Sequence, residues 1–284
     1  MSDVTQTGTD GRPLDLPAWS EVFHGDELGP RPDLGLDHPI TSDWAYGDRS
    51  GRGVRVAVID SGVDGSHPLV GGVAEYVSIV IDAETEAGVR FEREPHEDLY
   101  GHGTACAGVI RALAPEAELV SVRVLGASLK GSAGVFARGV QWCIDNGIVI
   151  ANLSLSTTNE RWAETFHGLV DTAAFRRMLL VSAMANERRR SIPSEFAGVF
   201  SVACGPGTDR ERFWCNPNGP AEWGAPGIGV DVAWNGHSTI TTDGNSFAAP
   251  VIAGHLARIM GAHPDLTGWQ ARTVLAALAV DAAD

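Results

Sequence analysis

The sequence predicts an α/β fold, a three-layer sandwich in which a mostly parallel central sheet is flanked by helices. From about residue 42 onward, short apolar runs of strand character alternate with longer stretches of helical character. The strand-like runs are apolar almost throughout, which is typical of parallel strands buried on both faces. The chain has 284 residues, 44% of them hydrophobic, so it is long enough and apolar enough for one large core.

The elements are expected in the following order along the chain. Strands are expected over Val54–Ile59, Glu75–Ile81, Leu119–Val124, Val149–Leu155, Leu179–Ala183 and Val199–Ala203. Helices are expected over His102–Leu113, Gly134–Asn146, Glu160–Phe175, Ser246–Ala262 and Thr267–Ala279. Such an alternation places helices on both faces of the sheet, and ligands then bind beyond the carboxyl ends of the strands.

Two segments are expected outside this regular pattern, and a third leads into a helix. Residues 1–41 are rich in Gly, Pro and Asp without periodicity, which predicts an irregular N-terminal arm ahead of one domain over 42–284. The acidic stretch Asp82–Asp98 is expected to be a solvated surface insertion. Thr239–Asn245 has loop character, and Pro250 is expected in the first turn of the following helix, where no intrahelical amide is lost.

Charge and hydropathy exclude two classes of partner. The formal net charge is −15 and Arg188–Arg190 is the one basic triplet, so no basic stripe offers itself to a nucleic acid. The apolar runs are far too short to span a bilayer. The first ten residues have neither a basic nor an apolar region of a secretory signal. A cytoplasmic location is therefore expected, with secretion left open if the chain is a processed fragment.

The four cysteines match no metal-ligand spacing. Cys204 and Cys215 flank a loop and are able to pair in an oxidising compartment, but the start of the chain favours reduced thiols. Cys106 follows His102 by one helical turn and is expected to be a small buried core residue.

Three glycine-bearing turns carry the parts of a nucleophilic site. Asp60 ends the first strand, His102 opens a helix, and Ser246 precedes another helix. A hydroxyl becomes a good nucleophile when a base takes its proton and an anion orients that base. Each residue alone has an ordinary structural explanation, as a turn aspartate, a core histidine or a capping serine. Their joint presence favours catalysis.

The three runs resemble the motifs of the subtilisin-like serine proteases, the subtilases. Asp60–Pro68 resembles the aspartate motif of the family, His102–Gly108 its histidine motif, and Asn245–Pro250 its serine motif. The resemblance covers residues from about 42 to 280. It implies a subtilisin-like fold and acyl transfer, in which Ser246 attacks the scissile carbonyl, His102 carries the proton and Asp60 orients the imidazole.

The same resemblance suggests a group that holds the oxyanion. Leu179–Glu187 is similar to the strand that ends in the family's oxyanion-hole asparagine, which makes Asn186 the expected donor, together with the Ser246 backbone N–H. Ala185 stands where the family commonly has glycine. Asn152, in a second similar strand, is expected to be a structural hydrogen-bonder instead.

An extended peptide is the expected substrate, bound by adding its backbone to a sheet edge on either side. The resemblance places those edges at Ser154–Ser156 and Gly126–Gly131. The expected substrate-binding residues are Gly126, Gly131, Ser154, Leu155, Ser156, Ala183 and Glu187. Ser156-Thr157 stands where the family commonly has Gly after the Ser-Leu pair, and Ala133 stands where many relatives place an aromatic lid over the S4 pocket.

The loop after Asn186 bears on specificity. Glu187, the arginine triplet Arg188–Arg190 and Ser191, which takes the place of a pocket-wall glycine, lie near the expected S1 pocket. We expect polar or charged groups of this loop to favour acidic or small P1 residues. Long arginine side chains also extend readily into water, so a solvated loop is the alternative.

No cofactor or metal is expected. The segment after His102 lacks the looped insertion that gives many bacterial relatives a strong calcium site, and no cluster of oxygen ligands replaces it. The acidic stretch Asp82–Asp98 offers carboxylates, but a solvated face is the expectation there.

These observations favour a serine endopeptidase that works through an acyl-enzyme, with intracellular processing of a precursor peptide as one fitting role. Transamidation on the same triad is an alternative, although no insertion near Ser246 is large enough to exclude water. A catalytically silent peptide-binding module is the third possibility. The presence of Asp60, His102, Ser246 and Asn186 argues against it. The sequence does not indicate an oligomeric state.

Overall fold

A nine-stranded sheet forms the middle layer of the computed structural model, which describes residues 39–85, 88–216 and 220–280. Its strands are β1 Arg55–Asp60, β2 Glu75–Ile81, β3 Val89–Glu92, β4 Glu118–Arg123, β5 Ile150–Leu153, β6 Leu179–Ala183, β7 Phe200–Gly205, β8 Trp214–Cys215 and β9 Trp223–Pro226. A separate two-stranded sheet consists of β10 Val230–Trp234 and β11 Ser238–Thr242. The helices are α1 Ser42–Tyr46, α2 His102–Leu113, α3 Ala133–Asp145, α4 Ala163–Phe175, α5 Asn245–Ala262 and α6 Gly268–Leu278. The 3₁₀ turn η2, Glu160–Trp162, precedes α4.

The strand order is β3-β2-β4-β1-β5-β6-β7-β9-β8. Strands β2, β4, β1, β5, β6, β7 and β9 run parallel, while β3 and β8 pair antiparallel at the two edges. This arrangement confirms the predicted α/β sandwich with a mostly parallel sheet. The order reverses at β1, with β4 on one side and β5 on the other, which is where a parallel sheet opens a crevice at its carboxyl end.

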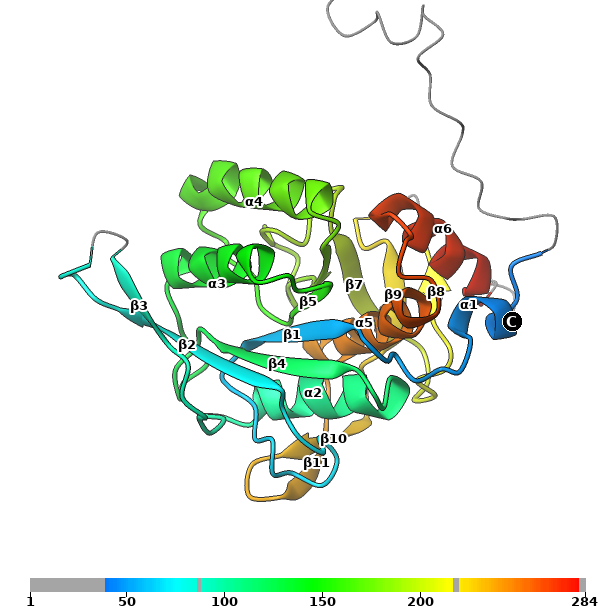
Figure 1. Cartoon of the computed structure of the whole chain (residues 1–284), viewed down its shortest axis with the longest axis horizontal. Helices are drawn as coiled ribbons and strands as arrows, with labels where there is room; N and C mark the ends of the chain where they lie inside the picture. The colour runs from blue at the N-terminus through cyan, green and yellow to red at the C-terminus, as the bar shows by residue number, and fades with distance from the viewer. Residues whose placement is uncertain (1–38, 86–87, 217–219, 281–284) are drawn as a thin grey trace, which may run out of the picture. The chain divides into compact units, whose positions relative to one another are not determined.

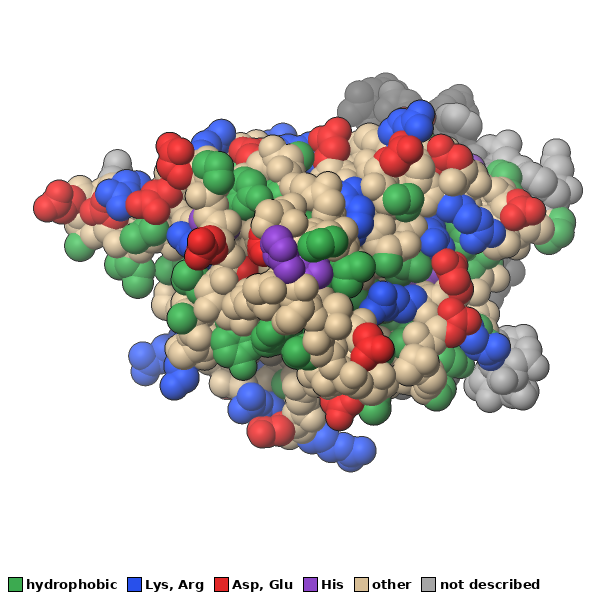
Figure 2. All heavy atoms as spheres, turned by 90° about the horizontal axis from the view of Figure 1, so that it is seen from below, with side chains coloured by type: hydrophobic (Ala, Val, Ile, Leu, Met, Phe, Trp, Pro, Cys, Tyr) green, Lys and Arg blue, Asp and Glu red, His purple; other side chains and the backbone are tan. Residues whose placement is uncertain are grey.

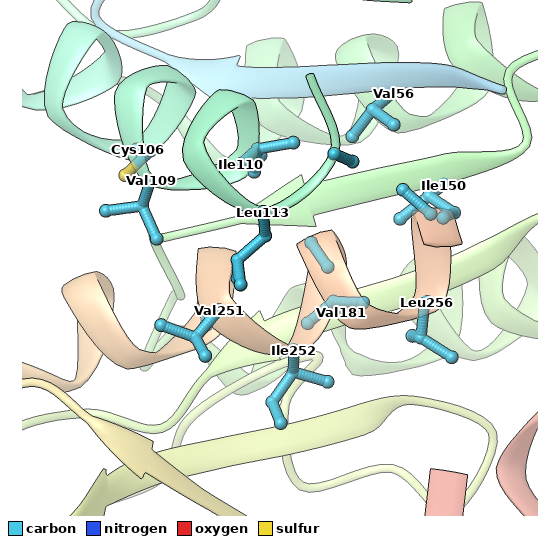
Figure 3. Packing of buried hydrophobic residues seen from close by; sticks show 14 of the residues in the cluster. Val56, Cys106, Val109, Ile110, Leu113, Ile150, Val181, Val251, Ile252 and Leu256 are labelled. Atoms are coloured by element: carbon cyan, nitrogen blue, oxygen red, sulfur yellow. The ribbon is translucent and has the colours of Figure 1, made fainter. Parts of the chain in front are cut away.

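Helices cover both faces of the sheet, with α3 and α4 on one face and α2 and α5 on the other (Figure 1). On the second face, Leu113 of α2 points toward α5, and Ile110, Val251 and Ile252 belong to the same buried cluster (Figure 3). These side chains are at most 2% exposed. Burying a large aliphatic side chain contributes about 1.5–3 kcal/mol, so this contact fixes the two helices that begin at His102 and Asn245.

The boundaries of the predicted regular elements agree with the structure to within about three residues. The prediction missed α1, the edge strands β3 and β8, the inner strand β9, and the hairpin β10–β11. These strands are short or carry few apolar residues, so their periodicity is weak. The predicted arm over 1–41 lies almost wholly outside the described residues, while the residues from Ile40 onward form one unit.

Three local expectations were wrong. Thr239–Thr242 is part of strand β11 rather than a loop, because it pairs antiparallel with β10. The stretch Asp82–Asp98 is more than a solvated insertion, since it contains β3, which pairs with β2. Pro250 is the sixth residue of α5 and lies inside the helix rather than in its first turn.

No helix of the described ranges is long and apolar enough to cross a membrane. Acidic and basic side chains are interspersed over the face that Figure 2 shows.

Candidate active site

Asp60 and His102 meet at the carboxyl end of the sheet. Asp60 is the last residue of β1 and His102 the first of α2. The His102 Nδ1 lies 2.9 Å from Asp60 Oδ1 and 2.8 Å from Oδ2. Asp60 is 0% exposed, and the Ser61 backbone N–H donates to its Oδ1 at 2.8 Å. The buried carboxylate therefore holds Nδ1 in its protonated form and turns Nε2 outward as the free acceptor.

This close meeting depends on a glycine. A Cβ on Gly103 would lie 2.0 Å from the Gly62 carbonyl oxygen and 3.1 Å from the Asp60 Cβ. No larger residue fits between the start of α2 and the turn that follows β1 without moving one of them. The glycine next to His102 is thus a packing requirement of the aspartate–histidine contact.

The charge of His102 reflects two opposing influences. Burial by itself would lower the pKa of the imidazole, but the negative charge and hydrogen bond of Asp60, with a further contribution from Asp98, outweigh it. The pKa of His102 is therefore raised above its ordinary value. A more basic imidazole is a better proton acceptor, provided that the pH is high enough to leave it neutral.

A second buried carboxylate, Asp98, organises the start of α2. It accepts hydrogen bonds from the backbone N–H groups of Gly101 at 2.8 Å and Thr104 at 2.8 Å, and from the Ser61 hydroxyl at 2.7 Å. A carboxylate at a helix N-terminus satisfies amides that the helix leaves without partners. The sequence analysis placed Asp98 on a solvated face, but it is 7% exposed. An aspartate four residues before the candidate base, and three before the glycine N-cap, was the available signal.

Ser246 is the second residue of α5, and its carbonyl oxygen lies 3.6 Å from Cys106 Sγ, which is itself within 4.8 Å of the ligand atoms of Asp60 and His102. The Phe247 ring lies 5.3 Å from the His102 ring, centroid to centroid, which brings the start of α5 against the imidazole. Among the described residues, no hydrogen bond joins Ser246 Oγ to His102. Such bonds are often long before substrate binds. The Ser246 N–H belongs to the first helical turn, whose amides have no partners within the helix.

Asn186 lies at the same helix end. Its Oδ1 accepts a hydrogen bond of 3.0 Å from the Asn245 backbone N–H. That contact uses the oxygen of the side-chain amide and leaves its NH₂ group as a donor. Asn186 is exposed, so this donor is accessible next to the Ser246 N–H.

Asn245 was quoted within a motif, but no role was predicted for it. Its side chain donates to the carbonyl oxygens of Met184, at 3.1 Å, and Ala185, at 3.2 Å, and accepts from the Cys204 N–H at 2.8 Å. One side chain therefore ties the ends of β6 and β7 to the start of α5 and fixes the segment that leads to Asn186. Its position directly before Ser246 was the signal in the sequence.

The expected substrate edges are only partly open. Ser154–Ser156 follows β5 without regular structure, and the next residue, Thr157, pairs with Ile192 through hydrogen bonds of 2.8 and 3.0 Å. On the other side, Gly126 donates to the Lys130 carbonyl at 3.0 Å and accepts from the Leu129 N–H at 3.0 Å. The segment Gly126–Gly131 is thus a tight turn rather than an extended edge. Both the N–H and the carbonyl of Gly126 are hydrogen-bonded within this turn.

Two of the expected substrate-binding residues are buried and one is fully accessible. Ser154 is 8% and Ala183 4% exposed, whereas Leu155 and Ser156 are partly exposed. Glu187 is exposed and lies 3.5 Å from Arg189 in an ion pair. Gly131 is constrained by packing, since a Cβ there would meet the Val124 carbonyl oxygen at 2.6 Å.

The loop after Asn186 is held by its own charges. Arg190 pairs with Glu195 at 2.5 Å and with Glu160 at 3.2 Å. Ser191 is fully buried, and its hydroxyl accepts from the Ala185 N–H at 2.9 Å. The charge of Arg190 is therefore balanced by two glutamates, which removes part of the basis for a charged S1 site.

The structure also locates the remaining polar residues of the sequence analysis. Asn152 is 0% exposed and donates to Ser154 Oγ at 2.9 Å, as expected of a structural hydrogen-bonder. Cys204 and Cys215 are free thiols. Within the described ranges, the one cluster of three side chains able to ligate a metal is Asp60, His102 and Cys106, whose ligand atoms lie within 4.8 Å of one another. That cluster contains the aspartate–histidine pair itself.

Comparisons with known proteins agree with this geometry. The sequence model of the subtilase family matches residues 51–284. The chain is 32% identical to the thermostable alkaline protease of Halalkalibacterium halodurans over 236 residues, which is 78% of this chain and 61% of that protein. It is 32% identical to subtilisin Savinase of Lederbergia lenta over 239 residues, covering 80% and 83% of the two chains.

A solved structure is also similar. The crystal structure of a cold adapted subtilisin-like serine proteinase superposes with a TM-score of 0.65 at 26% identity, covering 80% of this chain and 82% of that one. The chain thus spans less than two thirds of the first relative but more than four fifths of the second relative and of the solved structure.

Proposed function

Because the chain belongs to the subtilase family, the subtilisin-type serine proteases, we propose that it hydrolyses peptide bonds through an acyl-enzyme formed on Ser246. The observation that carries this proposal is the contact of His102 Nδ1 with a fully buried Asp60, at 2.8 and 2.9 Å, next to the first turn of α5. This contact uses Nδ1 and leaves Nε2 as the acceptor of a ring that lies 5.3 Å from that of Phe247, the residue after the serine.

Each residue has a defined task in the proposed reaction. His102 Nε2 takes the proton of Ser246 Oγ as that oxygen attacks the carbonyl carbon, and the imidazolium that forms is stabilised by Asp60. The oxyanion accepts hydrogen bonds from the Asn186 side-chain NH₂ and the Ser246 N–H. His102 then gives the proton to the leaving amine, and water, activated by the same imidazole, releases the acyl group.

An extended peptide is the substrate that this crevice fits best. The backbone of Ser154–Ser156 offers one edge, and Lys130 and Gly131, at the end of the turn described above, offer a shorter one. The tight turn at Gly126 argues for fewer backbone hydrogen bonds than two full edges would give.

We also propose a processing role inside the cell, on a defined precursor peptide. It is supported by the four free cysteines, which are typical of proteins from reducing compartments. A defined substrate agrees with the shortened second edge, because a site with fewer backbone hydrogen bonds relies more on side-chain pockets.

A cleavage assay tests the proposed activity. The wild type should cleave an unstructured protein such as casein, and Ser246→Ala should lose about 10⁶-fold in kcat, the size established for the serine of subtilisin itself. Asn186→Ala should lose about 10²–10³-fold, again the scale of subtilisin's own asparagine. Mass spectrometry of the products separates the alternatives: linear products mark hydrolysis, cyclic ones transamidation, and intact substrate a binding module.

A further inference from the structure

The carbonyl group of Ser246 lacks the hydrogen-bond donor that it would ordinarily have within helix α5. In a helix it would accept a hydrogen bond from the N–H four residues later, which is residue 250. Pro250 has no N–H, although it lies inside the helix. The carbonyl of the candidate nucleophile therefore needs a partner from outside its own helix.

Ser154 supplies that partner. Its hydroxyl donates to the Ser246 carbonyl oxygen at 2.8 Å, and Cys106 Sγ approaches the same oxygen at 3.6 Å. Ser154 follows directly on β5, so the contact joins the central sheet to the first turn of α5.

The neighbours of Ser154 leave its proton available for this hydrogen bond. A serine hydroxyl has one proton to donate and two lone pairs that accept. Asn152 Nδ2 donates to Ser154 Oγ at 2.9 Å. The single S–H of Cys106 has two acceptors in reach, and it donates to the nearer one, Ser154 Oγ at 3.2 Å, rather than to the Ser246 carbonyl oxygen at 3.6 Å. Both donors are 0% exposed, and burial raises the pKa of the Cys106 thiol well above its usual range, which keeps it protonated. With both lone pairs occupied, the proton of Ser154 is left for the Ser246 carbonyl.

We propose that Ser154 is a positioning residue for the nucleophile: its hydroxyl replaces the helical hydrogen bond that Pro250 cannot give, and so holds the Ser246 backbone in the geometry of attack. Asn152 and Cys106 orient that hydroxyl. The proposal rests on the proposed role of Ser246. It also means that the residue whose backbone begins the substrate edge fixes the attacking serine by its side chain.

A double-mutant cycle tests whether the Ser154 hydroxyl takes the place of the missing N–H of residue 250 as the donor to the Ser246 carbonyl. Ser154→Ala removes the external donor, while Pro250→Ala restores an N–H at the helical position. We expect Ser154→Ala to lower kcat by roughly tenfold or more in the wild-type background, with KM changed by less than about threefold. In the Pro250→Ala background the same substitution should cost less than about threefold, because residue 250 then bonds the carbonyl.

The rate of labelling by a small fluorophosphonate is the second readout. The probe reacts with Ser246 without occupying the peptide edges, so a slower rate reports a displaced nucleophile rather than weaker peptide binding. Ser182→Ala is the matched control: it removes a hydroxyl that is also 0% exposed and lies on strand β6, adjacent to β5, but that has no hydrogen-bond partner among the described residues. Its labelling rate should stay within about twofold of the wild type.

The outcomes separate the two proposals. Equal losses from Ser154→Ala in both backgrounds, or a loss no larger than that of Ser182→Ala, would overturn the positioning role while leaving the activity intact. A wild type that neither reacts with the probe nor cleaves peptides would overturn the proposed function itself. If Ser154→Ala does not fold, as shown by its thermal melt, Ser154→Cys takes its place in the cycle. This weaker donor of similar size should give a smaller loss that Pro250→Ala again suppresses.

Discussion

The floor and the rim of the crevice are built on different principles. The floor, which we define as Asp60, Asp98, His102, Asn152 and Ser154, is at most 8% exposed throughout. Each of its side chains makes at least one hydrogen bond, while Asn152 Oδ1 is a buried atom without a partner among the described residues. The rim, the loop over residues 187–190 with the turn over residues 126–130, is largely exposed and held by ion pairs and its own backbone. Removing one partner of a buried hydrogen bond costs much free energy, because the other partner is left buried and unsatisfied. Removing one partner of an exposed ion pair costs little.

This difference predicts that substitutions in the floor change the rate of chemistry, while substitutions in the rim change the choice of substrate. The tests that follow run from the largest expected effect to the smallest.

Asp60→Asn should cause the largest loss in the floor. The amide keeps the shape of the carboxylate but favours the wrong tautomer of His102 and no longer stabilises its charge, so kcat should fall about 10⁴-fold. Steady-state kinetics on one peptide, alongside thermal melts, provides the check. A loss below about tenfold in a folded variant would show that Asp60 does not orient the base.

Gly103→Ala should damage the floor through packing alone. The added Cβ would lie 2.0 Å from the Gly62 carbonyl oxygen, so α2 or the turn after β1 must move. Overpacking of this kind costs about 1–3 kcal/mol, occasionally more, in the free energy of unfolding, and the displaced His102 should lower kcat as well. Urea titration measures the first effect. Gly108→Ala, in the same helix, is the milder comparison because its nearest atom, the Ala233 Cβ, is 3.2 Å away.

Asp98→Asn should shift the acid limb of the pH profile of kcat/KM rather than abolish activity. The charge of Asp98 helps to raise the pKa of His102, so its removal should lower that pKa. The base must be neutral to accept a proton, and activity appears as the pH rises through the His102 pKa. The acid limb of kcat/KM should therefore shift to lower pH in the variant. A shift to higher pH, or none, would show that Asp98 acts only as a helix cap.

The smallest rate effect is expected in the rim. Arg188→Ala should reduce cleavage of peptides with an acidic P1 residue by a few-fold, about the scale of an exposed ion pair, without changing the fluorophosphonate rate. Arg190→Ala is the paired control, since Arg190 already contacts Glu195 and Glu160. A wild-type peptide profile dominated by bulky apolar P1 residues would contradict the polar S1 pocket that the sequence suggested.

The same contrast explains what could be predicted. Asp60 at a strand end and His102 at a helix start follow from local sequence, because a parallel sheet brings the carboxyl ends of its strands together. The turn at Gly126 could not be foreseen, since it depends on Leu129 adopting a left-handed φ of 53°. Asp98 was misplaced because its burial comes from contacts with Ser61 and Thr104, which belong to two separate segments.

Helix α5 also has a feature that depends on a contact with a distant segment of the chain. The existence of this helix was evident from the sequence, but the position of Pro250 inside it was not. The proline leaves the Ser246 carbonyl without its helical donor, and the donor that replaces it is Ser154, 92 positions away in the chain. Long-range hydrogen bonds of this kind leave no local periodicity to detect.

Peptide mapping after fluorophosphonate labelling tests the central claim most directly, namely that Ser246 is a nucleophile activated by His102 and Asp60. The account predicts one adduct per chain, located by mass spectrometry on Ser246, formed rapidly by the wild type and about 10⁴-fold more slowly by Asp60→Asn. An adduct on another residue, or no adduct on a folded wild-type protein, would contradict it.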